Sequence, residues 1–454
     1  MPEFEPLYTA DEMRAAEARY PGYPDTAGEL MERAGGGVAG VALELFRGAH
    51  RWTVVCGGGA NGGDGRVAAR ELQRAGKDVR VVDAKAGETD LGSPDAIVDA
   101  LFGTGFAGEP RPDAAALIAA MNASDVPVVA VDLPSGVDAS TGEVVGAAVR
   151  ATASVTFHGR KVGHVVAPGR FHAGTVHVVD IGLEPAATET RAVTVDILRD
   201  VPRRKEGDTK YTAGHVLVVG GSPGLTGAPS LTAMAAMRAD AGYVTLAAPE
   251  STLPVFEQRL LEVVKRPLPD ELSELAAKAS SLAIGPGLGR EDRTHEFVRR
   301  TLAEIALPAV VDADALFKLE PDDWPAPRVL TPHEGEMAGL LGRDSKDIAA
   351  HRIASVRDAV RRFDCVVLLK GQDTLVAAPG RGLLVCSLGL PSLATAGTGD
   401  VLTGIVGAFL AKGMDAQLAA AAATAAQQRA SVEAPQRAGL IASDLIDALP
   451  RVLR

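Results

Sequence analysis

The chain has 454 residues, which is enough for two ordinary globular domains. Apolar residues make up 46% of it and aromatic residues only 4%, so the cores must be packed mainly with Val, Leu, Ile and Ala. The formal net charge of −12 argues against a nucleic-acid or anionic-membrane partner, because phosphate contacts need clustered Lys and Arg. A small phosphorylated ligand remains compatible with this charge, since backbone N–H groups can bind phosphate.

Three features of the sequence bear on location. The first residues carry acids where a secretory leader would need basic and apolar residues, and apolar runs such as 401–411 are too short to span a bilayer. The three cysteines, Cys56, Cys365 and Cys386, are predicted to be buried free thiols. We therefore expect a cytoplasmic protein without a membrane segment. We also expect it to form a homo-oligomer.

The first half of the sequence predicts an α/β domain with a parallel sheet. Short apolar runs, each followed by glycine, proline or aspartate, alternate with helical stretches, and helices are expected at 11–19 and 29–46. The predicted strands are 52–56, 79–82, 96–98, 126–131, 153–157 and 175–179.

Residues 184–212 interrupt this alternation and predict an interdomain connection, with domains at 1–204 and 205–454. Both domains are predicted to be doubly wound, with ligands at the carboxyl ends of their strands. In the second domain the predicted strands are 215–219, 243–247, 281–284, 309–311, 328–330 and 366–369, followed by a hairpin of 374–377 and 383–387 and by helices at 400–411 and 417–431.

A glycine-rich segment, GGGANGGDG at 57–65, follows the first predicted strand and leads into a helix expected to begin near Arg66. Such glycines let the backbone approach a ligand and point N–H groups at an anion near a helix N-terminus. The alternative is that they only allow tight packing between strand and helix. Asn61 and Asp64 interrupt the dinucleotide pattern GxGxxG, which indicates that the segment binds something besides phosphate.

Two more strand ends carry acids and glycines. Asp99 opens the segment DALFGTG, and Asp132 opens the segment DLPSGVD. A single aspartate at a strand end is often only a turn or helix cap, but three such segments at one crevice exceed what capping requires. Oxygen ligands from Asn61, Asp99 and Ser135 suit a hard cation, and Asp132 is the best candidate for proton transfer.

In this order, the three segments resemble the signatures of the NAD(P)HX epimerase (YjeF N-terminal) family, over residues 1 to about 200. That family interconverts the R and S forms of nicotinamide dinucleotides hydrated at ring position 6, and it binds potassium. The resemblance implies a Rossmann-like α/β/α sandwich in which Asn61, Asp99 and Ser135 coordinate potassium and Asp132 shuttles the proton. It implies substrate contacts at Ala60, Asn61, Gly62, Gly63, Asp64, Gly103, Thr104, Gly105 and Glu109. Ala60 stands where the family often has a second asparagine.

The most informative segment of the second half is ATAGTGDVLTG at 394–404, where glycines precede a helix whose first turn carries Asp400. Free N–H groups and the helix dipole form an anion hole, and an adjacent carboxylate can act as a base toward a hydroxyl. This combination serves phosphoryl transfer. The alternative is that Asp400 only stabilises the start of the helix.

Other strand ends of this half add supporting residues. His333, in the segment TPHEGE, is as readily a loop-capping histidine as a substrate contact. Lys370 follows a strongly apolar strand, which favours a phosphate or nucleotide role over an ordinary solvated lysine. Glycines recur at strand ends in GGS at 220–222, TGA at 226–228 and GPGLG at 285–289.

Together with DADAL at 312–316, these motifs resemble the ribokinase-like superfamily and, within it, the ADP- or ATP-dependent NAD(P)H-hydrate dehydratases, from about Lys210 to the C-terminus. The resemblance implies contacts to the hydrated nucleotide from Ala228, Gly287, His333 and Asp400. It implies that ADP is held by Lys370, Gly371, Gln372, Asp373, Thr374, Ala396, Gly397, Thr398 and Gly399, approached by 390–398. The implied chemistry is phosphorylation of the ring hydroxyl and its elimination, with Asp400 taking the hydroxyl proton and magnesium bridging the phosphates.

This sequence departs from that family at three places, which puts nucleotide fit and rate in doubt more than reaction class. Residues 390–393 read LPSL where Asn-Pro-Gly-Met is common, Ala396 replaces a glycine, and Phe317 stands where asparagine is frequent. The expected small-molecule partners are NADHX, NADPHX and ADP or ATP.

Two other interpretations remain at this point. The second domain could be a kinase of a small vitamin-like alcohol, since the glycine-rich loop and base are shared across the superfamily. The first domain could be a non-catalytic ligand-binding module, although loss of Asp99 or Asp132 would have been its sign and both are present.

Overall fold

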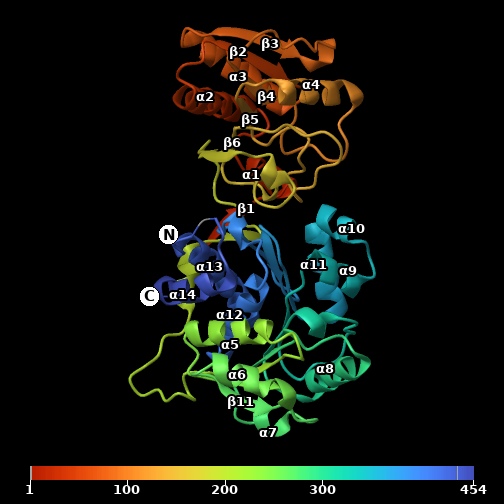
Figure 1. Cartoon of the computed structure of the whole chain (residues 1–454). Coiled ribbons are helices and arrows are strands. Elements are labelled where there is room, and N and C mark those ends of the chain that lie inside the picture. Colours follow the sequence, from red (N-terminus) through yellow and green to blue (C-terminus); the bar gives the residue numbers. More distant parts are fainter. Residues whose placement is uncertain (1–2, 437, 454) are drawn as a thin grey trace. The chain divides into compact units, whose positions relative to one another are not determined.

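The computed structural model describes residues 3–436 and 438–453 (Figure 1). The chain divides into two compact units: Pro6–Thr190 form one, and Met1–Glu5 with Arg191–Arg454 form the other. The dividing point thus lies earlier than the expected division after residue 204. Residues 191–204 belong with the C-terminal unit because the buried side chains of Val193, Ile197 and Leu198 pack into its core. In the part of the chain that is described, no helix is long and apolar enough to cross a membrane.

The N-terminal unit is built on a six-stranded parallel sheet with the order β3-β2-β4-β5-β6-β7. Its strands are β2 (Arg51–Cys56), β3 (Asp78–Asp83), β4 (Ala96–Ala100), β5 (Val128–Val131), β6 (Ala153–Phe157) and β7 (Thr175–Val179). The chain runs from β2 outward to β3 and then returns to β4 on the other side of β2. The crevice outside the carboxyl ends of β2 and β4 is therefore where a doubly wound sheet binds its ligand.

Helices cover both faces of this sheet, which explains why its central strands are mostly apolar and buried. The helices are α1 (Ala10–Glu17), α2 (Ala27–Leu45), α3 (Ala60–Arg74) and α4 (Pro112–Ala123). Buried residues of α2 and α3 share one core with Trp52, Val98 and Val155. On the opposite face, α4 packs through Leu117 and Ile118. The predicted strands are confirmed here to within two residues at each end.

One predicted boundary in this unit is wrong. The helix expected near Arg66 begins at Ala60, so most of the glycine-rich segment forms the first turns of α3. A Cβ on Gly62 would lie 1.9 Å from the carbonyl oxygen of Gly57, and one on Gly65 would lie 2.4 Å from Cβ of Ala100. These two glycines therefore let α3 pack closely on the sheet, as the packing alternative requires.

This close packing predicts opposite effects for two glycine-to-alanine changes inside helices. Gly62→Ala should destabilise the N-terminal unit by about 1–3 kcal/mol, because the added methyl group meets backbone. Gly40→Ala in α2 meets nothing within 4 Å and should stabilise by about 0.5–1 kcal/mol. Urea unfolding of the full chain in a Trp324→Phe background, which leaves buried Trp52 as the fluorescence probe, measures both. Equal stability of the two variants would contradict the packing argument.

The C-terminal unit contains an 11-stranded sheet, counted over the described residues, with the order β1-β8-β17-β16-β15-β14-β13-β12-β9-β10-β11. The strands from β11 to β15 are parallel, and β16 and β17 continue antiparallel. The bounds are β1 (Phe4–Leu7), β8 (Thr190–Val193), β9 (His215–Val219), β10 (Tyr243–Ala248), β11 (Val264–Pro267), β12 (Ser281–Ile284), β13 (Ala309–Val311), β14 (Arg328–Leu330), β15 (Val366–Leu369), β16 (Thr374–Ala377) and β17 (Leu383–Cys386).

Two groups of helices flank this sheet (Figure 1). On one side lie α5 (Gly227–Arg238), α12 (Thr398–Ala411), α13 (Ala416–Glu433) and α14 (Ala442–Val452), whose buried alanines and leucines join the sheet in one core. On the other lie α8 (Asp292–Glu304), α9 (Glu334–Leu341), α10 (Ser345–Ala350) and α11 (Arg352–Phe363). Two short helices, α6 (Leu253–Arg259) and α7 (Ser273–Ala276), precede β11 and β12. The doubly wound prediction is thus confirmed, and all three cysteines are buried and free.

Candidate active sites

In the N-terminal unit, Asp132 stands directly after β5 and is almost fully buried. Its backbone lies in the left-handed region, with φ of 65°, a conformation that residues other than glycine adopt at a cost. One carboxylate oxygen, Oδ1, accepts hydrogen bonds from Thr156 Oγ1 at 2.8 Å and pairs with Lys161 Nζ at 2.8 Å. The other, Oδ2, accepts a hydrogen bond from the backbone N–H of Thr104 at 3.1 Å.

The electrostatics around Asp132 favour the carboxylate form. Burial alone would raise the pKa of Asp132, but Lys161, together with His164 and the hydrogen bond from Thr156, lowers it below its usual value. The opposite holds for Asp64 in the first turns of α3, where burial, followed by repulsion from Asp132 and Glu17, raises the pKa to about 8. Two carboxyl groups whose pKa values are pushed apart are suited to separate base and acid roles.

Asp99 and Ser135 contact each other in the same unit. Asp99 lies inside β4, not after it as expected, and is fully buried. Its oxygens accept hydrogen bonds from Ser135 Oγ at 2.6 Å and Ser135 N at 2.8 Å, and the backbone N–H of Phe102 donates to Ser135 Oγ at 2.9 Å. Burial raises the pKa of Asp99 to about 6, and the hydrogen bonds from Ser135 and the backbone of Leu101 oppose this rise only in part.

Asn61 approaches the same cluster from α3. A Cβ on Gly103 would lie 2.6 Å from Asn61 Oδ1, so the amide lies against the loop that follows β4. Its Nδ2 is buried and has no hydrogen-bond partner in the part of the chain that is described. The structure thus brings Asn61, Asp99 and Ser135 to one region at the β2/β4 crevice. By contrast, Glu109, which was also predicted to contact the substrate, is exposed. Its side chain lies beside Gly146, where an added Cβ would be 3.1 Å from Cγ of Glu109.

In the C-terminal unit, Asp400 is the third residue of α12. The helix begins after Gly397, whose φ of 88° is open to glycine and strained for other residues. Burial, followed by repulsion from Asp312, raises the pKa of Asp400 to about 7, and Glu336 and Asp314 add to this against the opposing effect of Lys370. A general base with a pKa near neutrality is matched to proton abstraction at physiological pH.

Lys370 lies at the centre of this site. Its Nζ is 2.7 Å from Asp312 Oδ1 and 3.5 Å from Glu336 Oε2. Burial would lower the pKa of Lys370, but these two carboxylates raise it. A Cβ on Gly399 would lie 3.5 Å from Nζ, so the cation stands beside the first turn of α12. Thr403 donates to Asp312 Oδ2 at 2.6 Å, which fixes that turn to the end of β13.

The other residues predicted to contact the hydrated nucleotide lie at the carboxyl edge of the same sheet. Thr232 Oγ1 donates to the carbonyls of Ala228 at 3.1 Å and Asp400 at 3.0 Å, so these two residues come together. Gly287 accepts a hydrogen bond from Ser222 Oγ at 2.9 Å. His333 caps α9 through Nδ1, as the loop-capping alternative requires, while its side chain stays 58% exposed.

The predicted ADP-binding segment 370–374 presents little side chain to a ligand. Asp373 is buried, and its Oδ2 lies 3.2 Å from Nε of Arg352, which is itself buried. Thr374 Oγ1 donates to the carbonyl of Gly371 at 3.0 Å. Gly371 and Gln372 are exposed, so contact with ADP would come mainly from backbone and Gln372.

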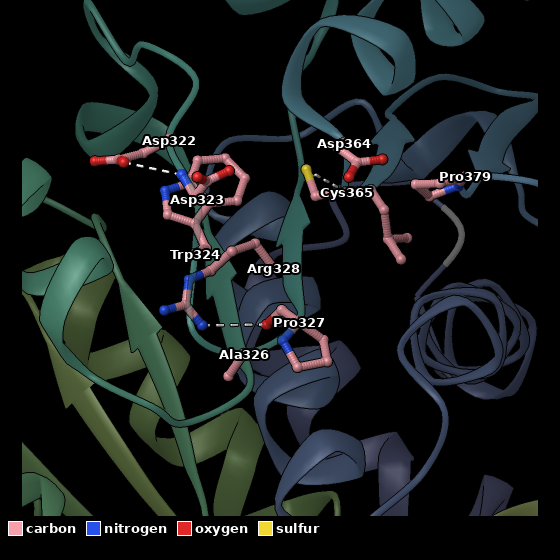
Figure 2. Close-up of a pocket in the computed structure, with 10 residues that line it drawn as sticks. Asp322, Asp323, Trp324, Ala326, Pro327, Arg328, Asp364, Cys365 and Pro379 are labelled. Atoms are coloured by element: carbon pink, nitrogen blue, oxygen red, sulfur yellow. Dashed lines mark hydrogen bonds between the residues drawn. The ribbon is translucent and has the colours of Figure 1, made fainter.

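A cavity of about 440 Å³ lies elsewhere in this unit (Figure 2). It is lined by Asp322, Trp324, Asp364 and the first residues of β14 and β15. These are the amino ends of the strands, whereas His333 and Lys370 follow the carboxyl ends of the same two strands. We therefore do not assign this cavity to the active site.

Several residues of the two sites were missed in the sequence. Lys161, Thr156 and His164 hold Asp132, and nothing in the surrounding residues sets them apart from ordinary strand and loop residues. Asp312 and Thr403 lie within the motifs DADAL and ATAGTGDVLTG, but the sequence does not show that they contact each other or that Asp312 pairs with Lys370. A lysine that follows an apolar strand is the signal from which an acid at a neighbouring strand end can be predicted.

Comparisons with known proteins match both halves of the chain to families. Residues 216–451 match the family described as NAD(P)H-hydrate dehydratase, and residues 27–89 and 82–163 match the YjeF-related protein N-terminus. A bifunctional NAD(P)H-hydrate repair enzyme of Moorella thermoacetica is 38% identical, covering 94% of this chain and 92% of its own. One from Escherichia coli is 33% identical, covering 94% and 89%.

A solved structure extends the match to the fold. The ADP/ATP-dependent NAD(P)H-hydrate dehydratase of Bacillus subtilis, co-crystallised with ATP and Mg²⁺, is 28% identical with a TM-score of 0.53. The match covers 57% of this chain and 96% of that one. This chain belongs to the family of bifunctional NAD(P)H-hydrate repair enzymes.

Proposed function

We propose that the N-terminal unit epimerises R- and S-NAD(P)HX and that the C-terminal unit dehydrates S-NAD(P)HX to NAD(P)H at the expense of ADP or ATP. The observation that carries this proposal is the presence of two different acid–base centres in one chain. Asp132 is held as a carboxylate beside Lys161, while Asp400 stands at a glycine-flanked helix start with a pKa near 7. The whole-length similarity to bifunctional repair enzymes supports this assignment over a small-alcohol kinase fused to a non-catalytic module.

In the dehydratase reaction, Asp400 removes the proton of the ring hydroxyl while the hydroxyl oxygen attacks the terminal phosphorus of the donor. The start of α12 and Lys370 stabilise the charge on the transferred phosphoryl group. When ADP is the donor, AMP leaves. The ring nitrogen then expels the phosphate, and the neighbouring ring carbon loses a proton. The sum is hydrate plus ADP giving NAD(P)H, AMP and phosphate.

Magnesium is expected in this site mainly on the phosphate oxygens of the donor. Among the described residues, no three His, Cys, Asp or Glu side chains form a metal site, and nearby Asp312 already pairs with Lys370 and Thr403. Magnesium is commonly held by one or two carboxylates plus substrate phosphates, where it neutralises developing charge.

In the epimerase reaction, the hydroxyl and the ring nitrogen share one carbon, so inversion requires a bond at that carbon to open and re-form. Asp132 would take the hydroxyl proton as the carbon–oxygen bond becomes a carbonyl and the carbon–nitrogen bond opens, with its electron pair going to the conjugated ring nitrogen. The nitrogen then adds back to the opposite face of the carbonyl, and Asp132 returns the proton to the oxygen. Oδ2 is the oxygen for this step, because it accepts one hydrogen bond, from the backbone N–H of Thr104, whereas Oδ1 is occupied by both Thr156 and Lys161.

Asn61, Asp99 and Ser135 fit a potassium ion. Asp99 is a fully buried carboxylate that contacts Ser135 Oγ, and the amide oxygen of Asn61 lies against the loop that follows β4. Potassium would supply the missing positive charge close to the substrate. The three buried free thiols are typical of a reducing compartment, which supports a cytoplasmic location. Homo-oligomer formation stays a prediction, which sedimentation analysis tests.

The potassium site predicts an ion-dependent epimerase. Replacing potassium by lithium should lower the epimerisation rate of the wild-type chain and leave the dehydratase rate on pure S epimer unchanged. Asp99→Asn should remove the difference between the two salts, because the ion loses its only anionic ligand. Both rates are measured by separating the epimers at fixed times. An epimerase that is indifferent to the cation would remove potassium from the proposal.

A further inference from the structure

The segment that follows β6 contacts Asp132 at both its side chain and its main chain. Thr156, near the end of β6, and Lys161, four residues after β6 ends, reach Oδ1 of Asp132. His164 reaches the carbonyl oxygen of the same residue, with Nε2 at 2.8 Å. Asp132 N donates to Val155 O at 2.8 Å, so β6 and this segment hold the strained residue from several directions.

The ammonium group of Lys161 is buried against three protein acceptors. Its side chain is 1% exposed, and Nζ lies 2.8 Å from Asp132 Oδ1, 2.8 Å from Thr156 Oγ1 and 2.9 Å from the carbonyl oxygen of Phe157. An ammonium group has three hydrogens, and these three acceptors use all of them. Lys161 therefore has no donor left for a substrate, which makes it a positioning residue and not a catalytic one.

His164 holds the main chain in the same way. The backbone N–H of Lys161 donates to His164 Nδ1 at 2.9 Å, so in the neutral ring the hydrogen is on Nε2 and is donated to the Asp132 carbonyl. Burial, which Asp132 only partly opposes, lowers the pKa of His164 to about 4. The ring stays neutral across the working range and does not take part in proton transfer.

We propose that Lys161, supported by Thr156 and His164, is the residue that keeps Asp132 an ionised base with Oδ2 facing the ring hydroxyl. This inference rests on the epimerase activity proposed above. The titratable groups that face Asp132 from the elements around it are Glu17 of α1, Asp64 of α3, His164 and Lys161. His164 is neutral, and the raised pKa of Asp64 leaves that group largely protonated. Lys161 is therefore the cation of this set, and its ammonium decides whether the buried carboxylate keeps its charge.

Lys161→Met is the direct test. Without the ammonium group, Asp132 is ionised only at higher pH. The fall of kcat/KM for epimerisation on the acid side of the pH profile (the acid limb) should therefore move upward by about one to three pH units. The loss should fall on kcat and not on KM, because Lys161 does not touch the substrate. The loss should be greatest at the lowest pH at which the chain stays folded and should shrink as the pH rises.

Two variants separate positioning from simple damage to the fold. Thr156→Val keeps both charges and the side-chain shape, and should move the limb in the same direction by a smaller amount. Lys412→Met removes another buried lysine, paired with Asp240 at 2.7 Å in the C-terminal unit, and should leave the epimerase pH profile unchanged. Thermal unfolding of each full-length variant reports whether the N-terminal unit is folded.

A double variant gives the most specific result. If Lys161 acts through Asp132, adding Lys161→Met to Asp132→Asn should cause no further loss of epimerisation, whereas an independent structural role would cause one. An unmoved limb in both Lys161→Met and Thr156→Val, with wild-type epimerase active, would overturn the inference. Absence of epimerisation in the wild-type chain would instead overturn the proposed function.

Discussion

Asp400→Asn is expected to lower the rate of ADP-dependent recovery of NADH absorbance from hydrated NADH by roughly 10²–10⁴-fold. The reason is that an amide, which cannot accept the hydroxyl proton, replaces the base at an otherwise unchanged site. Epimerisation by the same molecule should continue at the wild-type rate, since Asp132 lies in the other compact unit. Asp347→Asn, an exposed change on α10, is the matched control and should retain both activities. Unchanged recovery in Asp400→Asn would remove this residue from the chemistry.

The wild-type chain should also show the titration of this base. Burial, with Asp312 next, raises the pKa of Asp400 to about 7, and only the ionised form accepts a proton. Dehydratase kcat/KM should therefore fall as the pH decreases through about 7, and level off above it. A rate that stays constant down to pH 5 would show that another group removes the hydroxyl proton.

Asp132→Asn has the second large expected effect. The amide cannot accept the hydroxyl proton, so epimerisation should fall by roughly 10²–10⁴-fold while dehydration of pure S epimer stays normal. With a mixture of epimers, the variant should therefore leave the R form unrepaired. The measurement is the amount of each epimer over time, with slow spontaneous epimerisation subtracted. Complete repair at the normal rate would contradict the epimerase assignment.

Much of the fold could be predicted because the strands of both units are buried on both faces. Runs such as 153–157 and 216–219 are continuously apolar or small and end where the strands end. The strands that were missed, β1, β8 and β11, are short and carry proline or charged residues. The start of α3 at Ala60 depends on Gly62 meeting the carbonyl of Gly57, a contact that local glycine content does not reveal.

The motif-bearing residues of the sites were found for a related reason. Asp99, Asp132 and Lys370 stand in or directly after strands, and a parallel sheet brings such positions to one edge. Their partners were not found, because the Lys161–Asp132 and Lys370–Asp312 pairs join residues whose distance in sequence gives no signal. Asp373 could not be recognised as buried, since its neighbours in sequence resemble an exposed loop and Arg352 lies on another element.

The most direct test of the central claim is to incubate the full-length chain with a mixture of hydrate epimers, ADP, magnesium and potassium. Every nucleotide is then separated and quantified. The account predicts that wild-type chain converts both epimers to NADH, that Asp132→Asn converts only the S epimer, and that Asp400→Asn converts neither while still interconverting them. Wild-type chain that leaves both hydrates unconverted, or an Asp400→Asn variant that still forms NADH, would contradict it.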